Sequence, residues 1–280
     1  MFRSRQVELK TPEQIKTMRK AGLVVARALA AVAAEARAGI TTGELDETAH
    51  EVIRSAGALP SFFGYGQTAG QPGFPGVVCI SVNEEVVHGI PGGRVLADGD
   101  LVSVDCGAIV TGWHGDSALT LEVGSASADA RQLSAGTRDA LWRGIAAARL
   151  GGHVTDISAA VEKHVRSLPQ PYGIIAEYVG HGIGSAMHQP PDVPNSGRPG
   201  RGPKIVEGLC LAVEPMLTLG SPENDVLDDE WTVVTADGKW ASHWEHTITV
   251  TQNGTWVLTA EDGGEQMLTE LGVPFGPLSD

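Results

Sequence analysis

Five residues of this chain are candidate ligands for metal ions: Asp105, Asp116, His181, Glu214 and Glu245. The four acids adjoin apolar runs that read as strands, where a carboxylate is rarely left without a partner. The histidine stands in a tight glycine setting, Gly180-His181-Gly182-Ile183-Gly184. Four carboxylates and one imidazole suit two divalent first-row ions. The pattern therefore predicts a dinuclear metal site, and with it a metallohydrolase.

The charges of the four acids support this interpretation. Carboxylates that converge in a dry centre repel one another and become partly protonated. Two divalent cations balance four negative charges, and a water shared by the ions becomes hydroxide near neutral pH. Taken alone, Asp116 would more often be a cap, a turn residue or half of an ion pair, and Glu245 would fit a salt bridge nearly as well. An internal repeat changes that balance.

The repeat consists of four segments that recur in the same order. The matched pairs are residues 44–55 with 156–167, 88–91 with 181–184, 99–105 with 208–214, and 114–116 with 243–245. Asp105 is then the counterpart of Glu214, and Asp116 is the counterpart of Glu245. Equivalent acids at equivalent positions favour one shared site over four separate structural roles.

The repeat also predicts the domain organisation. Two α+β halves, residues 22–124 and 140–254, would be related by a pseudo-two-fold axis that brings the four carboxylates to the centre. We expect one catalytic domain over residues 1–280, with residues 261–280 as a tail that wraps the surface or frays. The first helix is expected to begin after Thr11 in a capping box.

Composition excludes several classes of function. The net charge of −14 disfavours nucleic acid and anionic membranes as partners. No apolar segment follows the basic N-terminus, so neither a secretion signal nor a membrane span is predicted. Three isolated cysteines, Cys79, Cys106 and Cys210, indicate buried thiols in a reducing cytoplasm. Basic residues near the N-terminus are interpreted as a solvated helix face: Arg3, Arg5, Lys10, Lys16, Arg19 and Lys20.

Two further histidines are candidates for contact with a substrate. His88 is the repeat counterpart of His181, and we interpret it as a hydrogen-bond donor facing the substrate rather than a core residue. His188 follows His181 by seven residues, so it is expected to reach the same cavity and to steady a developing oxyanion. Three others adjoin the acids and could orient them: His114, His243 and His246.

The five candidate ligands resemble those of the bacterial type I methionine aminopeptidases, with His181 in GHGIG, Glu214 in EPM and Glu245 in EHT. The resemblance covers the chain from the helix after Thr11 to about Trp256. It implies the pita-bread fold, with two α+β halves around a central antiparallel curved sheet. It also implies removal of the initiator methionine from new polypeptides, with a preference for a small second residue.

The resemblance assigns roles to the metal ligands. Asp116 and Glu245 would bridge both ions, Asp105 would complete one ion, and His181 with Glu214 would complete the other. A bridging hydroxide would attack the scissile carbonyl while Glu214 moves protons. The sequence leaves the ions open among cobalt, manganese, iron and zinc.

Substrate contacts follow from the same resemblance. His88 and His188 would hold the peptide and the tetrahedral intermediate. Six residues would form the methionine pocket, with ordinary core packing as the alternative: Phe62, Tyr65, Phe74, Cys79, Met187 and Trp231. The implied partners are N-terminal methionyl peptides and nascent chains, met by a cytoplasmic monomer. A contact at the ribosome exit fits this task, and only the basic N-terminal residues point to it.

Related enzymes provide the rival interpretations. The gaps of 32 residues from His181 to Glu214 and 30 from Glu214 to Glu245 leave no room for the insertion of the type II enzyme. About 100 residues precede Asp105, too few for the extra domain of prolidase-like relatives. The segment Gln67–Gly73 looks longer than the family pattern and leaves the pocket lining open. An X-Pro aminopeptidase or dipeptidase, a non-catalytic binding protein of this fold, and a serine hydrolase are the alternatives; no GxSxG motif supports the last.

Overall fold

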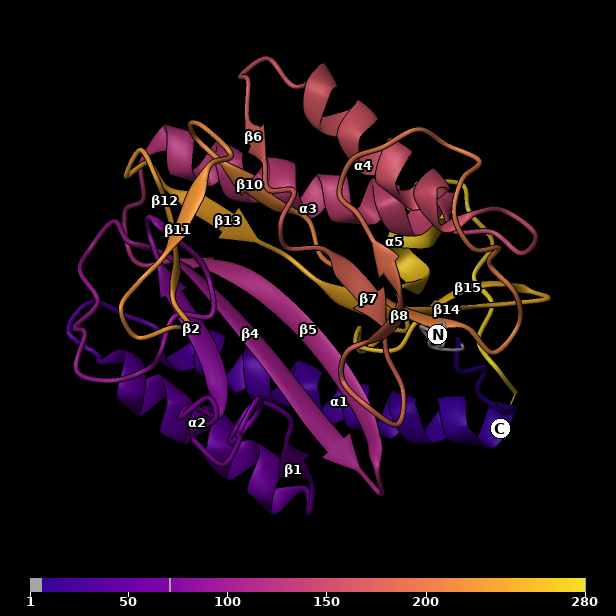
Figure 1. Ribbon diagram of the computed structural model, residues 1–280, viewed down its shortest axis with the longest axis horizontal. Coiled ribbons are helices and arrows are strands. Elements are labelled where there is room, and N and C mark those ends of the chain that lie inside the picture. The colour runs from indigo at the N-terminus through magenta and orange to yellow at the C-terminus, as the bar shows by residue number, and fades with distance from the viewer. Residues whose placement is uncertain (1–6, 71, 280) are drawn as a thin grey trace.

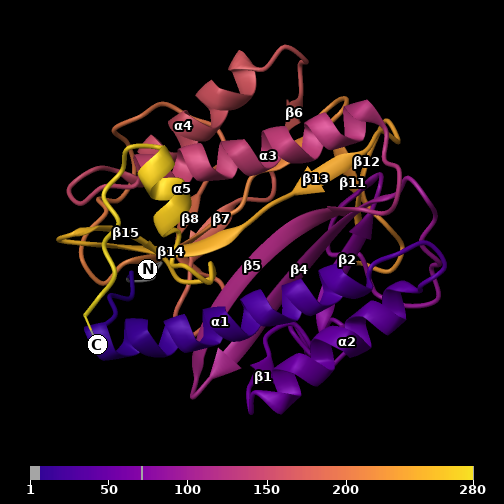
Figure 2. The same cartoon turned by 180° about the vertical axis from the view of Figure 1, so that it is seen from behind.

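Two pairs of helices lie on the outside of curved antiparallel strands in the computed structural model, which describes residues 7–70 and 72–279 (Figure 1). The helices are α1 (Pro12–Glu35), α2 (Thr42–Ser55), α3 (Ala128–Ala147), α4 (Val154–Ser167) and α5 (Glu265–Glu270). Seen from behind, α1 and α2 cover one half of the strands, and α3 and α4 cover the other (Figure 2). This arrangement confirms the predicted α+β class.

The strands form four small sheets. They are β1 (Leu59–Pro60), β2 (Val78–Val82), β3 (Glu85–Val87), β4 (Leu101–Val110), β5 (Trp113–Glu122), β6 (Gly173–Ile174), β7 (Gly180–Gly182), β8 (Gln189–Val193), β9 (Cys210–Val213), β10 (Met216–Thr218), β11 (Asn224–Val226), β12 (Val233–Thr235), β13 (Ala241–His243), β14 (His246–Thr251) and β15 (Gly254–Val257).

A long antiparallel hairpin runs through each half. In the first half, β4 and β5 pair along their whole length, with β2 on the other side of β4. In the second half, β9 pairs with β14 and β10 pairs with β13 in one register, since Val213 opposes His246 and Met216 opposes His243. The four acids of the candidate site lie near the middle of these two hairpins.

The first two helices begin with the same local device. Thr11 accepts a hydrogen bond from the N–H of Gln14 at 3.3 Å, and the Gln14 side chain accepts the N–H of Thr11 at 2.8 Å. This capping box, which the sequence predicts, satisfies two N–H groups that the helix leaves free. Thr41 and Glu44 form the same pair, so α2 begins at Thr42.

Glycines let α1 pack directly on the backbone of β5. A Cβ on Gly115 would lie 2.6 Å from the backbone nitrogen of Gly22, so a larger residue does not fit. A Cβ on Gly22 would lie 2.1 Å from the carbonyl oxygen of Leu258. Helix α1 therefore supports the strand segment that carries Asp116, the residue next to Gly115.

The basic residues near the N-terminus differ in part from the prediction. Lys10 is buried, and the partly buried Arg19 donates to the carbonyl oxygens of Val257 (3.3 Å) and Leu258 (2.9 Å), so neither lies on a solvated face. Arg3 and Arg5 lie outside the described residues. In the C-terminal segment, α5 packs through Leu268, which is buried. Within the described residues, no helix has the length and apolarity needed to cross a membrane.

Strand pairing contradicts the predicted equivalence of His88 and His181. His181 lies in β7, which pairs with β9 two residues before Glu214. In the first half, the residue of β4 two positions before Asp105 is Ser103, and it pairs with Ser81 of β2. Ser81 therefore occupies the place of His181 in the first half, whereas His88 follows β3, which belongs to another sheet.

Candidate metal centre and substrate pocket

The four acids come together because the two hairpins are joined through their own backbone. The N–H of Glu245 donates to the carbonyl oxygen of Ala118 at 2.9 Å, and the reverse bond measures 3.3 Å. The hydroxyl of Thr247 donates to the carbonyl oxygen of Asp116 at 2.7 Å and accepts its N–H at 3.1 Å. The contact between the halves thus fixes Asp116 beside Glu245.

His181 is directed at the acids by its glycine neighbours. A Cβ on Gly180 would lie 2.4 Å from the carbonyl oxygen of Ala212, and one on Gly182 would lie 2.2 Å from that of Pro190. Glycine alone lets β7 lie this close to its neighbouring backbones. The Nδ1 atom of His181 lies 3.0 Å from the carbonyl oxygen of Gly182 and acts as the donor in that pair. Its Nε2 is left as an acceptor, 3.4 Å from Oε1 of Glu214.

The converging atoms fit a cation. Ligand atoms of Asp116, His181 and Glu245 all lie within 4.8 Å of one another, and all three residues are buried. Asp105 and Glu214 stand outside that group but border the same cavity. One carboxylate oxygen each of Asp105, Asp116 and Glu245 is buried without a hydrogen-bond partner. Buried oxygens without partners are costly, and divalent ions would satisfy them.

The electrostatics of the site indicate the same need for positive charge. Burial raises the pKa of Asp105 to about 7. Burial first, and then the negative charge of neighbouring acids, raises the pKa of Asp116, Glu214 and Glu245 well above the usual range. Burial, and then His188, lowers the pKa of His181 to about 3, which keeps the imidazole neutral and able to bind a metal.

An apolar pocket opens onto the acids. All six predicted pocket residues line it, and their placement agrees with a role beyond ordinary core packing: Phe62, Tyr65, Phe74, Cys79, Met187 and Trp231. The rings of Phe74 and Trp231 meet edge to face at 5.4 Å. Phe74 accepts the N–H of Gly64 at 2.8 Å and donates its own N–H to the carbonyl oxygen of Tyr65 at 2.9 Å. These bonds hold Tyr65 and Phe74 side by side at the pocket.

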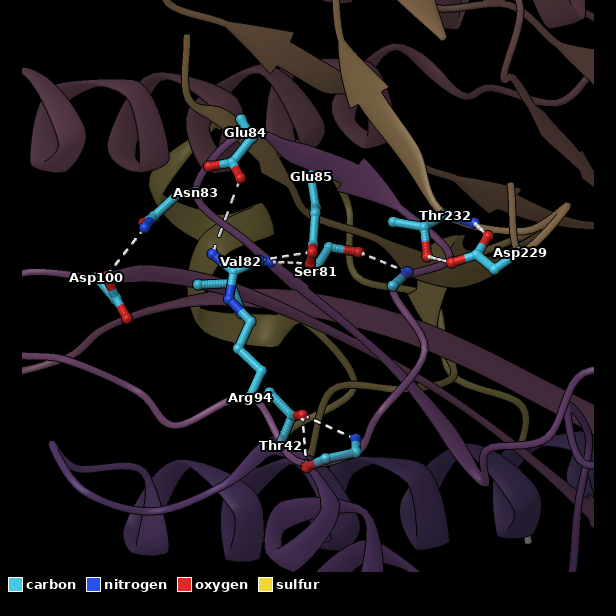
Figure 3. A network of polar contacts seen from close by, with 12 residues as sticks. Thr42, Ser81, Val82, Asn83, Glu84, Glu85, Arg94, Asp100, Asp229 and Thr232 are labelled. Atoms are coloured by element: carbon cyan, nitrogen blue, oxygen red, sulfur yellow. Dashed lines mark hydrogen bonds and ion pairs between the residues drawn. The ribbon is translucent and has the colours of Figure 1, made fainter. Parts of the chain in front are cut away.

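The loop that carries Trp231 is fixed by a carboxylate. Asp229 accepts the N–H of Trp231 at 2.9 Å. It also accepts the N–H of Thr232 at 2.8 Å and the Thr232 hydroxyl at 2.6 Å (Figure 3). Glu230, between them, has a positive φ of 64°, a backbone conformation that side chains rarely adopt. These bonds hold the turn that directs the indole into the pocket.

His88 is held in a strained turn at the pocket wall. Its φ is 60°, in the left-handed region. The N–H of the next residue, Gly89, donates to the Ser81 hydroxyl at 3.1 Å, and that of Gly92 donates to the Thr42 hydroxyl at 2.9 Å (Figure 3). Burial lowers the pKa of His88 to about 4, so its ring is neutral at pH 7.

His188 also lines the cavity. Its Nδ1 lies 2.5 Å from the hydroxyl of Tyr65, and its ring lies 4.3 Å from that of His181. His243 also lines the cavity, with Nε2 3.8 Å from Oε2 of Glu214. His114 instead lies against Ser61, with its Nδ1 2.9 Å from that hydroxyl.

The sequence prediction misses several residues of the pocket wall: Val87, Tyr178, Val179 and Met216. Two of these carry a usable signal, because Tyr178 and Met216 lie three residues before His181 and two after Glu214. Side chains near a ligand along the chain can reach the same cavity. Val87 has no such signal, since an apolar strand residue looks the same in a core and in a pocket.

Five candidate metal ligands at the junction of two paired α+β halves fit a metallopeptidase of the pita-bread type. The chain belongs to metallopeptidase family M24, whose family model matches residues 16–252. It is 50% identical over 260 residues to methionine aminopeptidase 1 of Mycobacterium tuberculosis, covering 91% of this chain and 96% of that protein.

Solved structures agree with this assignment. The crystal structure of methionine aminopeptidase from Thermotoga maritima superimposes with a TM-score of 0.87 at 39% identity, covering 91% of this chain and 100% of that one. Prolidase from Pyrococcus furiosus, at 20% identity and a TM-score of 0.69, shares the fold; the match covers 90% of this chain and 65% of that one. These findings confirm the pita-bread fold.

Proposed function

We propose that the protein is a methionine aminopeptidase that removes the initiator methionine from new polypeptides and favours a small second residue. The observation that carries the proposal is a set of buried carboxylate oxygens without partners at the end of an apolar pocket. A thioether side chain would fill the space between the aromatic and apolar walls of this pocket. The scissile bond would then lie beside the acids.

Two divalent ions would be held by the five ligands of the site: Asp105, Asp116, His181, Glu214 and Glu245. Four carboxylates balance the charge of two such ions, and one imidazole adds a nitrogen ligand. When bound, the ions would supply Lewis-acid activation of the peptide carbonyl and of water. Cobalt, manganese, iron and zinc all suit this mixed set.

Three residues of the chain would handle protons and the reacting peptide. Glu214, whose pKa burial and the neighbouring acids raise, is able to accept a proton and pass it to the leaving amine. His88 is neutral and would donate a hydrogen bond to the peptide backbone. His188, oriented by the Tyr65 hydroxyl, would stabilise the oxyanion of the tetrahedral intermediate.

Selection of methionine would come from the pocket wall. Phe62, Phe74, Cys79 and Met187 form one buried apolar cluster, with Trp231 packed against it. Such a wall excludes water and rejects charged side chains. Tyr65, which is partly exposed, would border the entrance.

The cellular setting follows from the activity. The substrates would be N-terminal methionyl peptides and nascent chains in the cytoplasm, met at the ribosome exit by a monomer. Residues 1–280 would form one catalytic domain, with halves 22–124 and 140–254 that each provide two acids.

The test uses metal-free protein titrated with each of the four ions on Met-Ala-Ser. We expect methionine release that saturates with ion concentration, and metal analysis that gives two ions per chain. Glu245→Ala should lose both bound metal and activity, while Glu13→Ala, an exposed acid on α1, should keep both. A panel of Xaa-Pro peptides separates the rival activity. Hydrolysis of Xaa-Pro bonds without release of methionine from Met-Ala-Ser would refute the proposal.

A further inference from the structure

The first described residues reach the loop between β7 and β8. Glu8 accepts the Ser185 hydroxyl at 2.6 Å and the Ser185 N–H at 3.1 Å. Lys10 donates to the side-chain oxygen of Gln189 at 3.3 Å, and Gln189 donates to the Ser185 hydroxyl at 3.2 Å. We call this closed ring of four side chains, Glu8, Lys10, Ser185 and Gln189, the N-terminal clamp.

The clamp is tightly fitted. The Lys10 side chain is 1% exposed, and its Nζ lies 3.5 Å from Oε2 of Glu8, so the buried ammonium has a charged partner. The N–H of Lys10 donates to the carbonyl oxygen of Gly208 at 2.8 Å, which anchors the segment next to β9. A Cβ on Gly184 would lie 2.2 Å from Cε of Lys10 and 2.3 Å from Oε2 of Glu8. The loop therefore packs on the clamp with no space between them.

The clamped loop carries two residues of the substrate cavity. Met187 is buried in the pocket wall, and His188 lies between the rings of Tyr65 and His181. Residues 183–188 adopt neither helix nor strand, so this loop has few backbone bonds of its own. One of them joins the N–H of Gly184 to the carbonyl oxygen of Ala186 at 3.1 Å. Backbone bonds join its first two residues to Cys210 and His114, and beyond them side chains such as Glu8 hold the loop.

We propose that Glu8 and Lys10 are positioning residues for the peptidase reaction. Acting through Ser185 and Gln189, they hold Met187 and His188 in place against the substrate. The inference rests on the proposed function, but it concerns a part of the chain more than 170 residues away from the loop it orders. Neither residue borders the catalytic cavity, so their effect on catalysis is indirect.

Kinetics provide the first test. With saturating divalent ion and Met-Ala-Ser, Glu8→Ala should lower kcat/KM by about tenfold or more, since misplacement of a catalytic group by about 1 Å costs up to 100-fold. Ser185→Ala should lower kcat/KM by a similar factor, and Ser185→Thr, which keeps the hydroxyl, should retain most activity. Glu13→Ala, an exposed acid on α1, serves as the matched control and should be unchanged.

A double variant separates positioning from general loss of stability. If Glu8 acts through His188, then adding Glu8→Ala to a His188→Ala variant should lower kcat/KM by less than about twofold, because the two effects are not additive. Hydrogen exchange of the peptide spanning residues 184–189 gives a readout that needs no activity. It should become faster in Glu8→Ala, while peptides from β4 keep their wild-type rates.

The outcomes distinguish this inference from the proposed function. An inactive wild-type protein would refute the proposed function and overturn the positioning role with it. If the wild type is active, three results would overturn the positioning role alone. Glu8→Ala would keep full kcat/KM, or it would lose the same factor in kcat/KM with and without His188, or it would leave hydrogen exchange of the loop unchanged.

Discussion

Replacing Asp105 by asparagine should stabilise the metal-free protein at neutral pH and destabilise the metal-loaded protein. Burial raises the pKa of Asp105 from 3.8 to about 7, so the folded metal-free chain holds a proton that the unfolded chain has released. Because the folded pKa is the higher one, the unfavourable contribution is absent below about pH 4. It grows as the pH rises to 7 and is constant above that.

The magnitude follows from the size of the shift. A difference of about three pKa units corresponds to about 4 kcal/mol of lost stability at pH 8. Asparagine cannot ionise and should remove this cost. With divalent ions bound, the negative charge of Asp105 becomes favourable and the sign reverses.

Urea unfolding at pH 5, 6, 7 and 8, with and without a chelator, measures both effects. The difference between wild type and Asp105→Asn in chelator should grow by about 3 kcal/mol across that range. Buried histidines titrate in both proteins and cancel in the difference. Asp228→Asn, at an exposed acid, is the control. A difference independent of pH would show that Asp105 is ionised in the folded metal-free chain and would refute the desolvation argument.

Three further predictions concern the pocket, the ligands and the chain ends. Trp231→Ala should raise KM for Met-Ala-Ser about tenfold with bound metal unchanged, because it removes one wall of the pocket; steady-state kinetics and metal analysis check this. His243→Leu should weaken ion binding by about 10- to 100-fold in calorimetry, while His243→Gln, which keeps an N–H near Glu214, should bind nearly as wild type. Arg19→Met should lower the free energy of unfolding in urea by about 2 kcal/mol, because carbonyl oxygens after β15 lose a charged donor.

The candidate ligands could be predicted from sequence because charge is rare in strands. Asp105 interrupts an apolar run and Glu214 ends one, and a carboxylate there needs a partner that the run itself does not contain. The glycines around His181 carry a similar signal, since a backbone segment with no room for a Cβ atom requires glycine. Such features are local, so a single sequence displays them.

The rest of the site depends on contacts between distant segments. Val87 is an ordinary strand residue, and only the junction of the halves makes it part of the cavity wall. The bond of Glu8 to Ser185 spans 177 positions and joins two common residue types. No periodicity or spacing marks such a pair, because neither residue conflicts with its local surroundings.

Register explains why the two halves give unlike pairs of acids. The pairing of His246 with Val213 and of His243 with Met216 places Glu245 directly opposite Glu214. In the first hairpin, Asp105 opposes Ala118 instead, and Asp116 opposes Gly107 two residues further along β4. An alignment of the repeat treats these pairs as equivalent, since it compares neighbours along the chain and not across strands.

The offset has a physical consequence. A directly opposed pair of acids on one face lies within the reach of one ion, whereas an offset pair spreads its oxygens along the strand. The second half also adds His181 through β7, where the first half has Ser81. The two cation positions would therefore differ in ligand number and type, although the fold repeats.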